Sequence, residues 1–272
     1  NNKIYLPQKI SKFLTTGRWN SPKMDDFIPG TCKINNPLPT PNFNQITSKI
    51  LSKSKPNSNQ FNFIMIGDPR TTNILSPVFR DILKIPHETY YANNYAEYLM
   101  ADHAWFRERI VRADYILIGE QFLWHHWENN FEFDVQVRAL GKILDLLMPY
   151  SKLVSPSNTD NNDNNKLTKK ILIMAPEPVP WSEFDAPLKI FDQKLKQLLL
   201  NYSDNYIYYM TNGRNSRYDV NQQMIPNYDQ YYKVHLPDEN LVKFEQLPAN
   251  LRSDIKIILS YFFSESVEDF CG

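Results

Sequence analysis

The stretch FNFIMIGDPRTTN, residues 61–73, decides the fold that the sequence predicts. Six residues typical of a buried strand, Phe61–Ile66, run into Gly67-Asp68 and then into Pro69-Arg70-Thr71-Thr72. A strand that breaks at a glycine and presents polar side chains at its carboxyl end is a common way to build a site in an α/β protein. The stretch therefore predicts both a central strand and the place of a functional site.

Three further apolar runs are also short, rich in β-formers and bounded by polar or proline and glycine residues: Tyr115–Ile118, Ile171–Ala175 and Tyr206–Met210. Between and after them, apolar residues recur at helical spacing on three faces: Val137, Leu140, Leu144 and Leu147; Leu188, Phe191, Leu195 and Leu198; and Leu251, Ile255, Ile258 and Phe262. Strands that alternate with helices predict the α/β class, with a single doubly wound parallel sheet flanked by helices.

The chain divides by composition at about residue 60. Residues 1–60 are rich in Pro, Asn, Ser and Lys and show little periodicity, so we predict an irregular N-terminal arm packed on the core. Residues 61–272 form one α/β domain in this interpretation. The low-complexity run SPSNTDNNDNNK, residues 155–166, predicts a disordered surface loop at about 152–168.

Composition excludes some partners. The 30 basic and 30 acidic residues cancel, so no overall charge favours nucleic acid or an anionic membrane. No run of about 18 apolar residues occurs, so no transmembrane segment is predicted within this chain. The first residue is Asn1 rather than Met, which leaves an upstream signal peptide or membrane anchor open.

Two cysteines, Cys32 and Cys271, lie near opposite ends of the chain. They are either two unrelated buried thiols or a terminal disulfide formed in an oxidising compartment. The glycosylation sequon Asn201-Tyr202-Ser203 is compatible with secretion but occurs by chance too often to decide.

Polar residues also follow the other predicted strands. Gly119, Glu120 and Gln121 come after the second strand, followed by WHHWE at residues 124–128, and His235 lies in the late stretch YDQYYKVHLPDE. In a parallel sheet such groups gather at the carboxyl ends of the strands. These ends are therefore the predicted site.

This layout resembles the SGNH (GDSL-type) hydrolase superfamily. The similarity is to its PC-esterase branch, which includes neurexophilin-and-PC-esterase proteins, plant trichome-birefringence-like acetyltransferases and the lumenal domain of fungal capsule O-acetyltransferases. The resemblance rests on Gly67-Asp68 followed by Arg70, on Gly119 followed by Trp124, on the late His235, and on the arm GRWNSPKMDDFIPGTC at residues 17–32. It implies carbohydrate O-acyl esterase or acyltransferase ancestry.

The sequence departs from that family at the catalytic positions. Pro69 stands where the family has its nucleophilic serine, and proline offers neither a hydroxyl nor a backbone N–H for the oxyanion hole. Tyr232 stands where an Asp-x-x-His element would place the aspartate, and Gln121 is the nearest candidate for the oxyanion asparagine. The departures predict a catalytically degenerate domain.

The resemblance therefore implies a lumenal (Golgi or ER) or extracellular domain that retains a binding role towards a glycan or another secretory-pathway protein. Its residual catalytic residues would be His235 and Asp68, its binding residues would be Arg70, Gly119, Gln121 and Trp124, and Cys32 would be bonded to Cys271. No cofactor is implied. The alternative is an active O-acyl (acetyl) esterase or acyltransferase on a glycan. It would use a rearranged site with Thr71 or Thr72 as nucleophile, or Asp68 or Glu120 as acid/base.

Three other features were weighed for a role in the site. His125-His126 with Glu128 suggests a metal, but adjacent histidines point to different sides and no third spaced ligand follows, so no metal site is predicted. Trp124, with the tryptophans at 127 and 181, forms either a stacking platform for sugar rings or part of the core. The charged stretch HAWFRERIVRAD, residues 103–114, predicts the solvated face of a helix.

Overall fold

The structure is a computed structural model of the 272-residue chain. It describes residues 38–53, 62–67, 71–92, 94–100, 104–119, 133–147, 169–176, 185–202, 207–210, 243–247 and 249–263. The predicted loop at 152–168 and the arm up to residue 37 lie outside the described residues.

The core of the fold is a five-stranded parallel sheet with the strand order β2-β1-β3-β4-β5. Its strands are β1 (Phe63–Gly67), β2 (Glu88–Tyr91), β3 (Tyr115–Ile118), β4 (Lys170–Met174) and β5 (Ile207–Met210). Four of the five strands match the apolar runs of the sequence. The predicted parallel sheet is confirmed, because β1 pairs in parallel with β3 and β3 pairs in parallel with β4.

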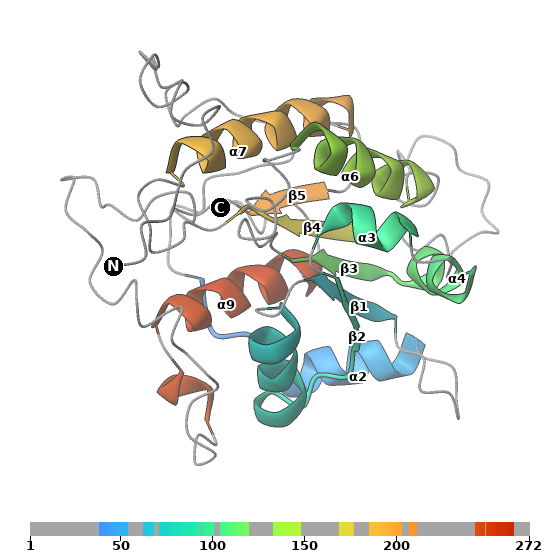
Figure 1. The fold of residues 1–272 in the computed structure, drawn as a ribbon. Helices are drawn as coiled ribbons and strands as arrows, with labels where there is room; N and C mark the ends of the chain where they lie inside the picture. Colours follow the sequence, from blue (N-terminus) through green and yellow to red (C-terminus); the bar gives the residue numbers. More distant parts are fainter. Residues whose placement is uncertain are drawn as a thin grey trace, which may run out of the picture.

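Helices cover both faces of the sheet, which confirms the doubly wound α/β class (Figure 1). One face carries α3 (Tyr95–Met100), α4 (Ala104–Arg112), α6 (Phe133–Leu147) and α7 (Asp185–Leu199). The other carries α2 (Phe43–Lys53), a helical segment over residues 71–82 and α9 (Ala249–Phe263). Two short 3₁₀ turns, η5 (Leu200–Tyr202) and η6 (Phe244–Gln246), complete the described elements. The predicted helical faces lie in α6, α7 and α9.

The central strands are apolar throughout because both of their faces are buried. In β1, Ile64 and Ile66 pack into the hydrophobic cluster under α6 and α7. Phe63 and Met65 point to the opposite side and pack with α2 and α9. This alternation follows from the two-residue period of a strand. Each central strand therefore contributes to two separate cores.

Two elements correct the sequence analysis. β2 was not predicted, because its residues, Glu88–Tyr91, are short, partly polar and only half buried at the edge of the sheet. α2 forms within residues 1–60, where an irregular chain was predicted. Only Ile46 and Ile50, one turn apart, are buried on its inner face, so the periodic signal was too brief to read. Whether the first 60 residues form a distinct arm stays a prediction.

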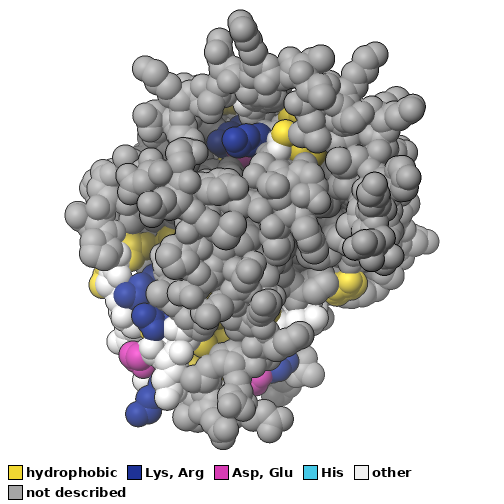
Figure 2. Space-filling model, turned by 60° about the vertical axis from the view of Figure 1, so that its left-hand side comes forward, with side chains coloured by type: hydrophobic (Ala, Val, Ile, Leu, Met, Phe, Trp, Pro, Cys, Tyr) yellow, Lys and Arg dark blue, Asp and Glu magenta, His cyan; other side chains and the backbone are white. Residues whose placement is uncertain are grey.

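On the face seen in Figure 2, Lys and Arg side chains lie in separate groups, some of them beside acidic side chains. None of the described helices is long and apolar enough to cross a membrane.

Candidate functional site

The strand order places a topological switch point between β1 and β3. The chain leaves β1 for β2 on one side and then returns to β3 on the other side. In open α/β sheets, ligands bind in the crevice at such a point, outside the carboxyl ends of the strands. The predicted site therefore coincides with the position that the topology favours.

Two glycines lie at this point. Gly67 ends β1, and its carbonyl accepts a hydrogen bond from the Ala92 N–H at 3.1 Å. Gly119 follows β3 directly, and its N–H donates to the Ile66 carbonyl at 2.6 Å. These bonds extend the pairing of the strands to their last residues. The ends of β1 and β3 are thus held side by side.

The side chain of Thr71 lies between the two glycines. A Cβ atom placed on Gly67 would lie 2.3 Å from Thr71 Oγ1, and one placed on Gly119 would lie 1.9 Å from the same atom. Both distances are shorter than real Cβ contacts allow. Thr71 is only 1% exposed. The buried Thr71 side chain therefore occupies the space between the ends of β1 and β3.

The two threonines that the sequence offered as alternative nucleophiles differ in their surroundings. Thr71 is enclosed between the strand ends, as described above. Thr72 is half buried, and its hydroxyl donates to Asn73 Oδ1 at 3.4 Å on the exposed side of the helical segment. Of the two hydroxyls, only that of Thr72 is partly open to solvent. A nucleophilic role for either residue stays a prediction.

The other predicted site residues lie outside the described residues: Asp68, Pro69, Arg70, Gln121, Trp124 and His235, together with Tyr232 and the cysteines Cys32 and Cys271. The sequence alone ties two groups of them to the site. Asp68-Pro69-Arg70 joins Gly67 to Thr71, and Gln121 comes two residues after Gly119. Their roles stay predictions.

The helical segment over residues 71–82 is partly π-helical. It contains two π-type stretches, η1 (Thr71–Leu75) and η2 (Val78–Ile82). The Leu83 N–H donates to the Val78 carbonyl at 3.0 Å, a bond that spans five residues. π-type turns are rare and occur frequently next to functional sites. Their presence directly after β1 agrees with a site at this strand end.

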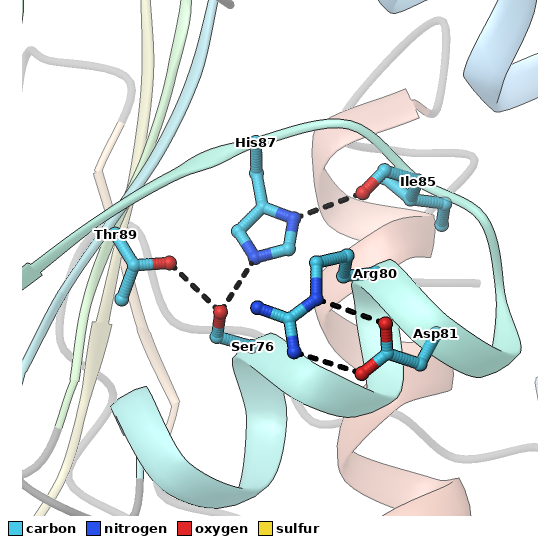
Figure 3. A network of polar contacts seen from close by, with 6 residues as sticks. All are labelled: Ser76, Arg80, Asp81, Ile85, His87 and Thr89. Carbon is cyan, nitrogen blue, oxygen red and sulfur yellow. Dashed lines mark hydrogen bonds and ion pairs between the residues drawn. The ribbon is translucent and has the colours of Figure 1, made fainter.

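A second polar cluster was not predicted and lies on the flank of the sheet (Figure 3). Ser76 Oγ lies 2.9 Å from His87 Nε2 and 2.8 Å from Thr89 Oγ1. His87 Nδ1 lies 2.9 Å from the Ile85 carbonyl oxygen. A serine hydrogen-bonded to an oriented histidine is a pattern that nucleophilic catalysis uses.

The donor in each hydrogen bond of this cluster can be assigned by starting from the Ile85 carbonyl. A carbonyl only accepts, so His87 Nδ1 carries the proton towards Ile85. Burial lowers the pKa of His87 and outweighs the hydrogen bond to the Ile85 carbonyl, which raises it. With a neutral imidazole, Nε2 accepts from the Ser76 hydroxyl. The Thr89 hydroxyl then donates to Ser76 Oγ. Every hydroxyl and ring nitrogen of the cluster is used within it.

The position of the Ser76 cluster favours a structural role over catalysis. Thr89 pairs in the sheet with Met65, two residues before the end of β1. The cluster is therefore beside the middle of the edge strand rather than at the carboxyl ends. Ser76 is 5% exposed, and the His87 ring packs against Phe63 at a centroid distance of 6.0 Å. The contacts tie the helical segment to β2.

An ion pair on the opposite face of β2 corrects one sequence prediction. The Arg109 guanidinium of α4 donates to both carboxylate oxygens of Glu88, and the Tyr90 hydroxyl donates to Glu88 Oε2 at 2.8 Å. The side chains of Arg109 and Glu88 are only 11% and 16% exposed. Burial, and to a smaller extent the hydrogen bond to Glu88, raises the pKa of Tyr90 to about 12. The stretch 103–114 is thus not simply a solvated face, although its Arg112–Glu108 pair is exposed.

Charged residues also gather at the amino ends of the strands, away from the predicted site. Lys169 Nζ donates to the carbonyls of Ile110, Val111 and Ala113 at the end of α4. Burial lowers the pKa of Lys169 to about 8, although the nearby Asp114 opposes this shift. A buried lysine that caps the last carbonyls of a helix needs no ligand to explain it. We assign this cluster a structural role.

Comparisons with known proteins identify no family. No family model matches the sequence, and no curated protein is similar to it. Among solved structures, the chain is similar to an acetylxylan esterase from Geobacillus stearothermophilus. That similarity has a TM-score of 0.35 and 12% identity, and it covers 53% of this chain and 74% of the esterase. At these values the similarity identifies neither a family nor an activity. Among the residues that the structure describes, no group of three or more His, Cys, Asp or Glu is placed to hold a metal ion.

Proposed function

We propose that the chain is a PC-esterase-like domain that binds a glycan or a partner protein at the carboxyl ends of β1 and β3 and has lost its acyl-ester chemistry. The position of Gly67 carries this proposal. The strand that ends there is next to the switch point, and Asp68-Pro69-Arg70 follows it in the sequence. Pro69 supplies no hydroxyl and no amide N–H. A site with charged groups but without a nucleophile suits binding better than turnover.

Each predicted residue has a role in such a site. The Arg70 guanidinium donates several hydrogen bonds in a fixed plane, which suits the hydroxyl, carbonyl or carboxylate oxygens of a glycan. The Asp68 carboxylate accepts from sugar hydroxyls, and the Trp124 ring offers an apolar surface for the face of a sugar ring. Gln121 and the backbone of Gly119 supply further polar contacts. His235 is the remaining base of the ancestral chemistry.

Turnover is the first test. We expect the purified chain to hydrolyse p-nitrophenyl acetate and O-acetylated oligosaccharides no faster than its His235→Ala variant, because the imidazole has no serine hydroxyl to activate. The Pro69→Ser variant restores a hydroxyl and an amide. It should still be weak, because Tyr232 does not orient the imidazole, a defect that costs about four orders of magnitude in a serine protease. Pro69→Ser combined with Tyr232→Asp should be faster than Pro69→Ser alone.

Turnover by the unmodified chain that depends on His235 would contradict the loss of chemistry. The alternative, an active esterase or acyltransferase with a rearranged site, would then apply. Thr72→Val is the variant that tests it, because the Thr72 hydroxyl is the one that is partly open to solvent. Loss of turnover in Thr72→Val with unchanged stability would assign the nucleophile.

Binding is the second test, with O-acetylated oligosaccharides as probes in calorimetric titrations. We expect Arg70→Gln to weaken binding about tenfold or more, because hydrogen bonds from charged groups contribute roughly 1.5–3 kcal/mol. Arg80→Gln is the matched control. Arg80 is an exposed arginine ten residues further along the chain, in the helical segment over residues 71–82, and is paired with the adjacent Asp81 at 2.8 Å. Equal effects of the two variants would remove Arg70 from the site.

Entry into the secretory pathway is tested independently of ligand binding. We propose that the chain enters the secretory pathway, that Cys32 is bonded to Cys271, and that Asn201 carries a glycan. Asn201 is exposed in η5, directly after α7, which supports access to its side chain. Thiol titration of the unreduced, denatured protein from secreting cells should find no free thiol, and Asn201→Gln should remove a glycan's mass. Two titratable thiols would reject the disulfide.

A further inference from the structure

Tyr91 is the last residue of β2 and lies at the same edge of the sheet as the candidate site. In the parallel pairing of β2 with β1, Tyr91 is the register partner of Gly67. The next residue, Ala92, donates its N–H to the Gly67 carbonyl at 3.1 Å. Gly119 follows β3 on the other side of β1, and its N–H donates to the Ile66 carbonyl at 2.6 Å. Tyr91 and Gly119 therefore flank Gly67 at the carboxyl ends of three adjacent strands.

The side chains of β2 alternate between the two faces of the sheet. Glu88 and Tyr90 share the face that carries α4, and the Tyr90 hydroxyl donates to Glu88 there. Thr89 points to the opposite face and is hydrogen-bonded to the helical segment over residues 71–82. The alternation places Tyr91 on the face of Thr89, two residues closer to the carboxyl end. β2 also lies against η1, the first part of that segment, so Tyr91 and η1 are on the same side of the sheet.

Tyr91 differs in exposure from the rest of β2. It is 57% exposed, whereas the other three residues of the strand are half buried. The described residues include three more exposed large apolar side chains: Leu51, Leu146 and Leu200. Each of these three lies near the C-terminal end of a helix or in the turn that follows one. Among the residues that the structure describes, Tyr91 is thus the exposed large apolar side chain that lies at the carboxyl end of a strand.

We propose that Tyr91 is a ligand-contacting residue of the site at the carboxyl ends of β1 and β3, where its ring packs against the C–H face of a pyranose sugar. The inference rests on the proposed glycan-binding function. A pyranose ring has an apolar C–H face surrounded by hydroxyl groups. A tyrosine has an apolar ring with one hydroxyl at its tip, so the two surfaces match in chemistry.

The ordinary alternative is that Tyr91 only favours the strand, since aromatic residues are good β-formers. That role needs no exposed ring, and threonine, another good β-former, would fill it equally well. Tyr91→Thr therefore removes the ring and keeps the preference for the strand. Tyr91→Phe keeps the ring and removes the hydroxyl. The two variants separate contact with a sugar from support of the strand.

The experiment is a calorimetric titration of the intact chain with O-acetylated oligosaccharides. We expect Tyr91→Thr to bind about tenfold more weakly, a typical loss when an aromatic contact residue is truncated. Tyr91→Phe should bind like the unmodified chain. Leu51→Ala is the matched control, because Leu51 is exposed to a similar degree, 52%, but lies in α2. Its affinity should be unchanged, and all of these variants should unfold at similar urea concentrations.

Saturation-transfer NMR gives a second measurement on the same samples. Irradiation of the aromatic protons should transfer signal to the ring C–H protons of the sugar, and the transfer should be weaker in Tyr91→Thr than in Tyr91→Phe. Equal affinity of Tyr91→Thr and the unmodified chain would overturn the ring contact and leave the proposed function standing. So would a Tyr91→Phe variant as weak as Tyr91→Thr. If the folded, unmodified chain binds no oligosaccharide, the glycan-binding proposal fails and the ring contact fails with it.

Discussion

The ends of β1 and β3 and the flank of β2 are built in opposite ways. At the strand ends, two glycines make room for one threonine side chain. On the flank of β2, polar side chains satisfy one another, as in the Ser76, His87 and Thr89 cluster and the Glu88, Arg109 and Tyr90 cluster.

The difference shows that residue types alone do not identify a site. Ser76 with His87 has the chemistry of a nucleophile and its base, but the donors and acceptors of the cluster are used within it, beside the middle of an edge strand. The ends of β1 and β3 show less chemistry in the described residues, but they lie where the topology of a parallel sheet opens a crevice. We therefore base the proposed site on position in the fold rather than on the inventory of reactive side chains.

The largest effect is expected from breaking the ion pair of the flank. Arg109→Gln leaves the Glu88 carboxylate largely buried without its cation. We expect a loss of about 2 kcal/mol in the free energy of unfolding, between the roughly 0–1 kcal/mol of exposed pairs and the roughly 3–5 kcal/mol of fully buried ones. Urea unfolding measures it.

Arg112→Gln is the matched control for Arg109→Gln, because Arg112 lies in the same helix and its pair with Glu108 is exposed. Its loss should stay below about 0.5 kcal/mol. Ligand binding should be unchanged in both variants at temperatures where they are folded. A binding defect in Arg109→Gln alone would move the functional site to the flank and break the comparison.

A smaller effect is expected from Ser76→Ala. The variant removes a hydroxyl that both donates to His87 and accepts from Thr89, so two half-buried groups lose a partner. We expect a loss of about 1–2 kcal/mol in unfolding free energy. Ser48→Ala, in which an exposed hydroxyl of α2 is lost, should cost less. Any turnover or labelling by fluorophosphonates that disappears in Ser76→Ala would mean that the cluster is catalytic.

The smallest effect is a pH dependence that His87 adds to stability. Burial lowers the pKa of His87 in the folded chain below its ordinary 6.5. Between the folded pKa and pH 6.5, the unfolded chain therefore binds more protons than the folded chain. The contribution is complete above pH 6.5 and is lost as the pH falls through the folded pKa. Urea midpoints at about pH 5 and about pH 7.5 should differ less in His87→Gln than in the unmodified chain. An equal difference in both proteins would show that His87 is not kept neutral.

The local sequence determined the central strands and the three long helices. Continuous apolar runs mark β1, β3, β4 and β5, because these strands are buried on both faces. Helical spacing marks α6, α7 and α9, because one buried stripe leaves a helical period within a single segment. The sequence also pointed to Gly67 and Gly119 as the ends of two strands. These glycines, with the residues that follow them, are the part of the candidate site that could be read without a structure.

Only the tertiary structure decided β2, the place of Thr71 and the roles of the polar clusters. β2 becomes a strand because β1 offers it an edge, since its own residues are short and partly polar. Ser76 meets His87 from 11 residues away, and Arg109 meets Glu88 from 21 residues away, through different elements in each case. Such contacts leave no periodicity within either segment. They exist because the sheet and its crossovers bring distant residues together, which a local pattern does not record.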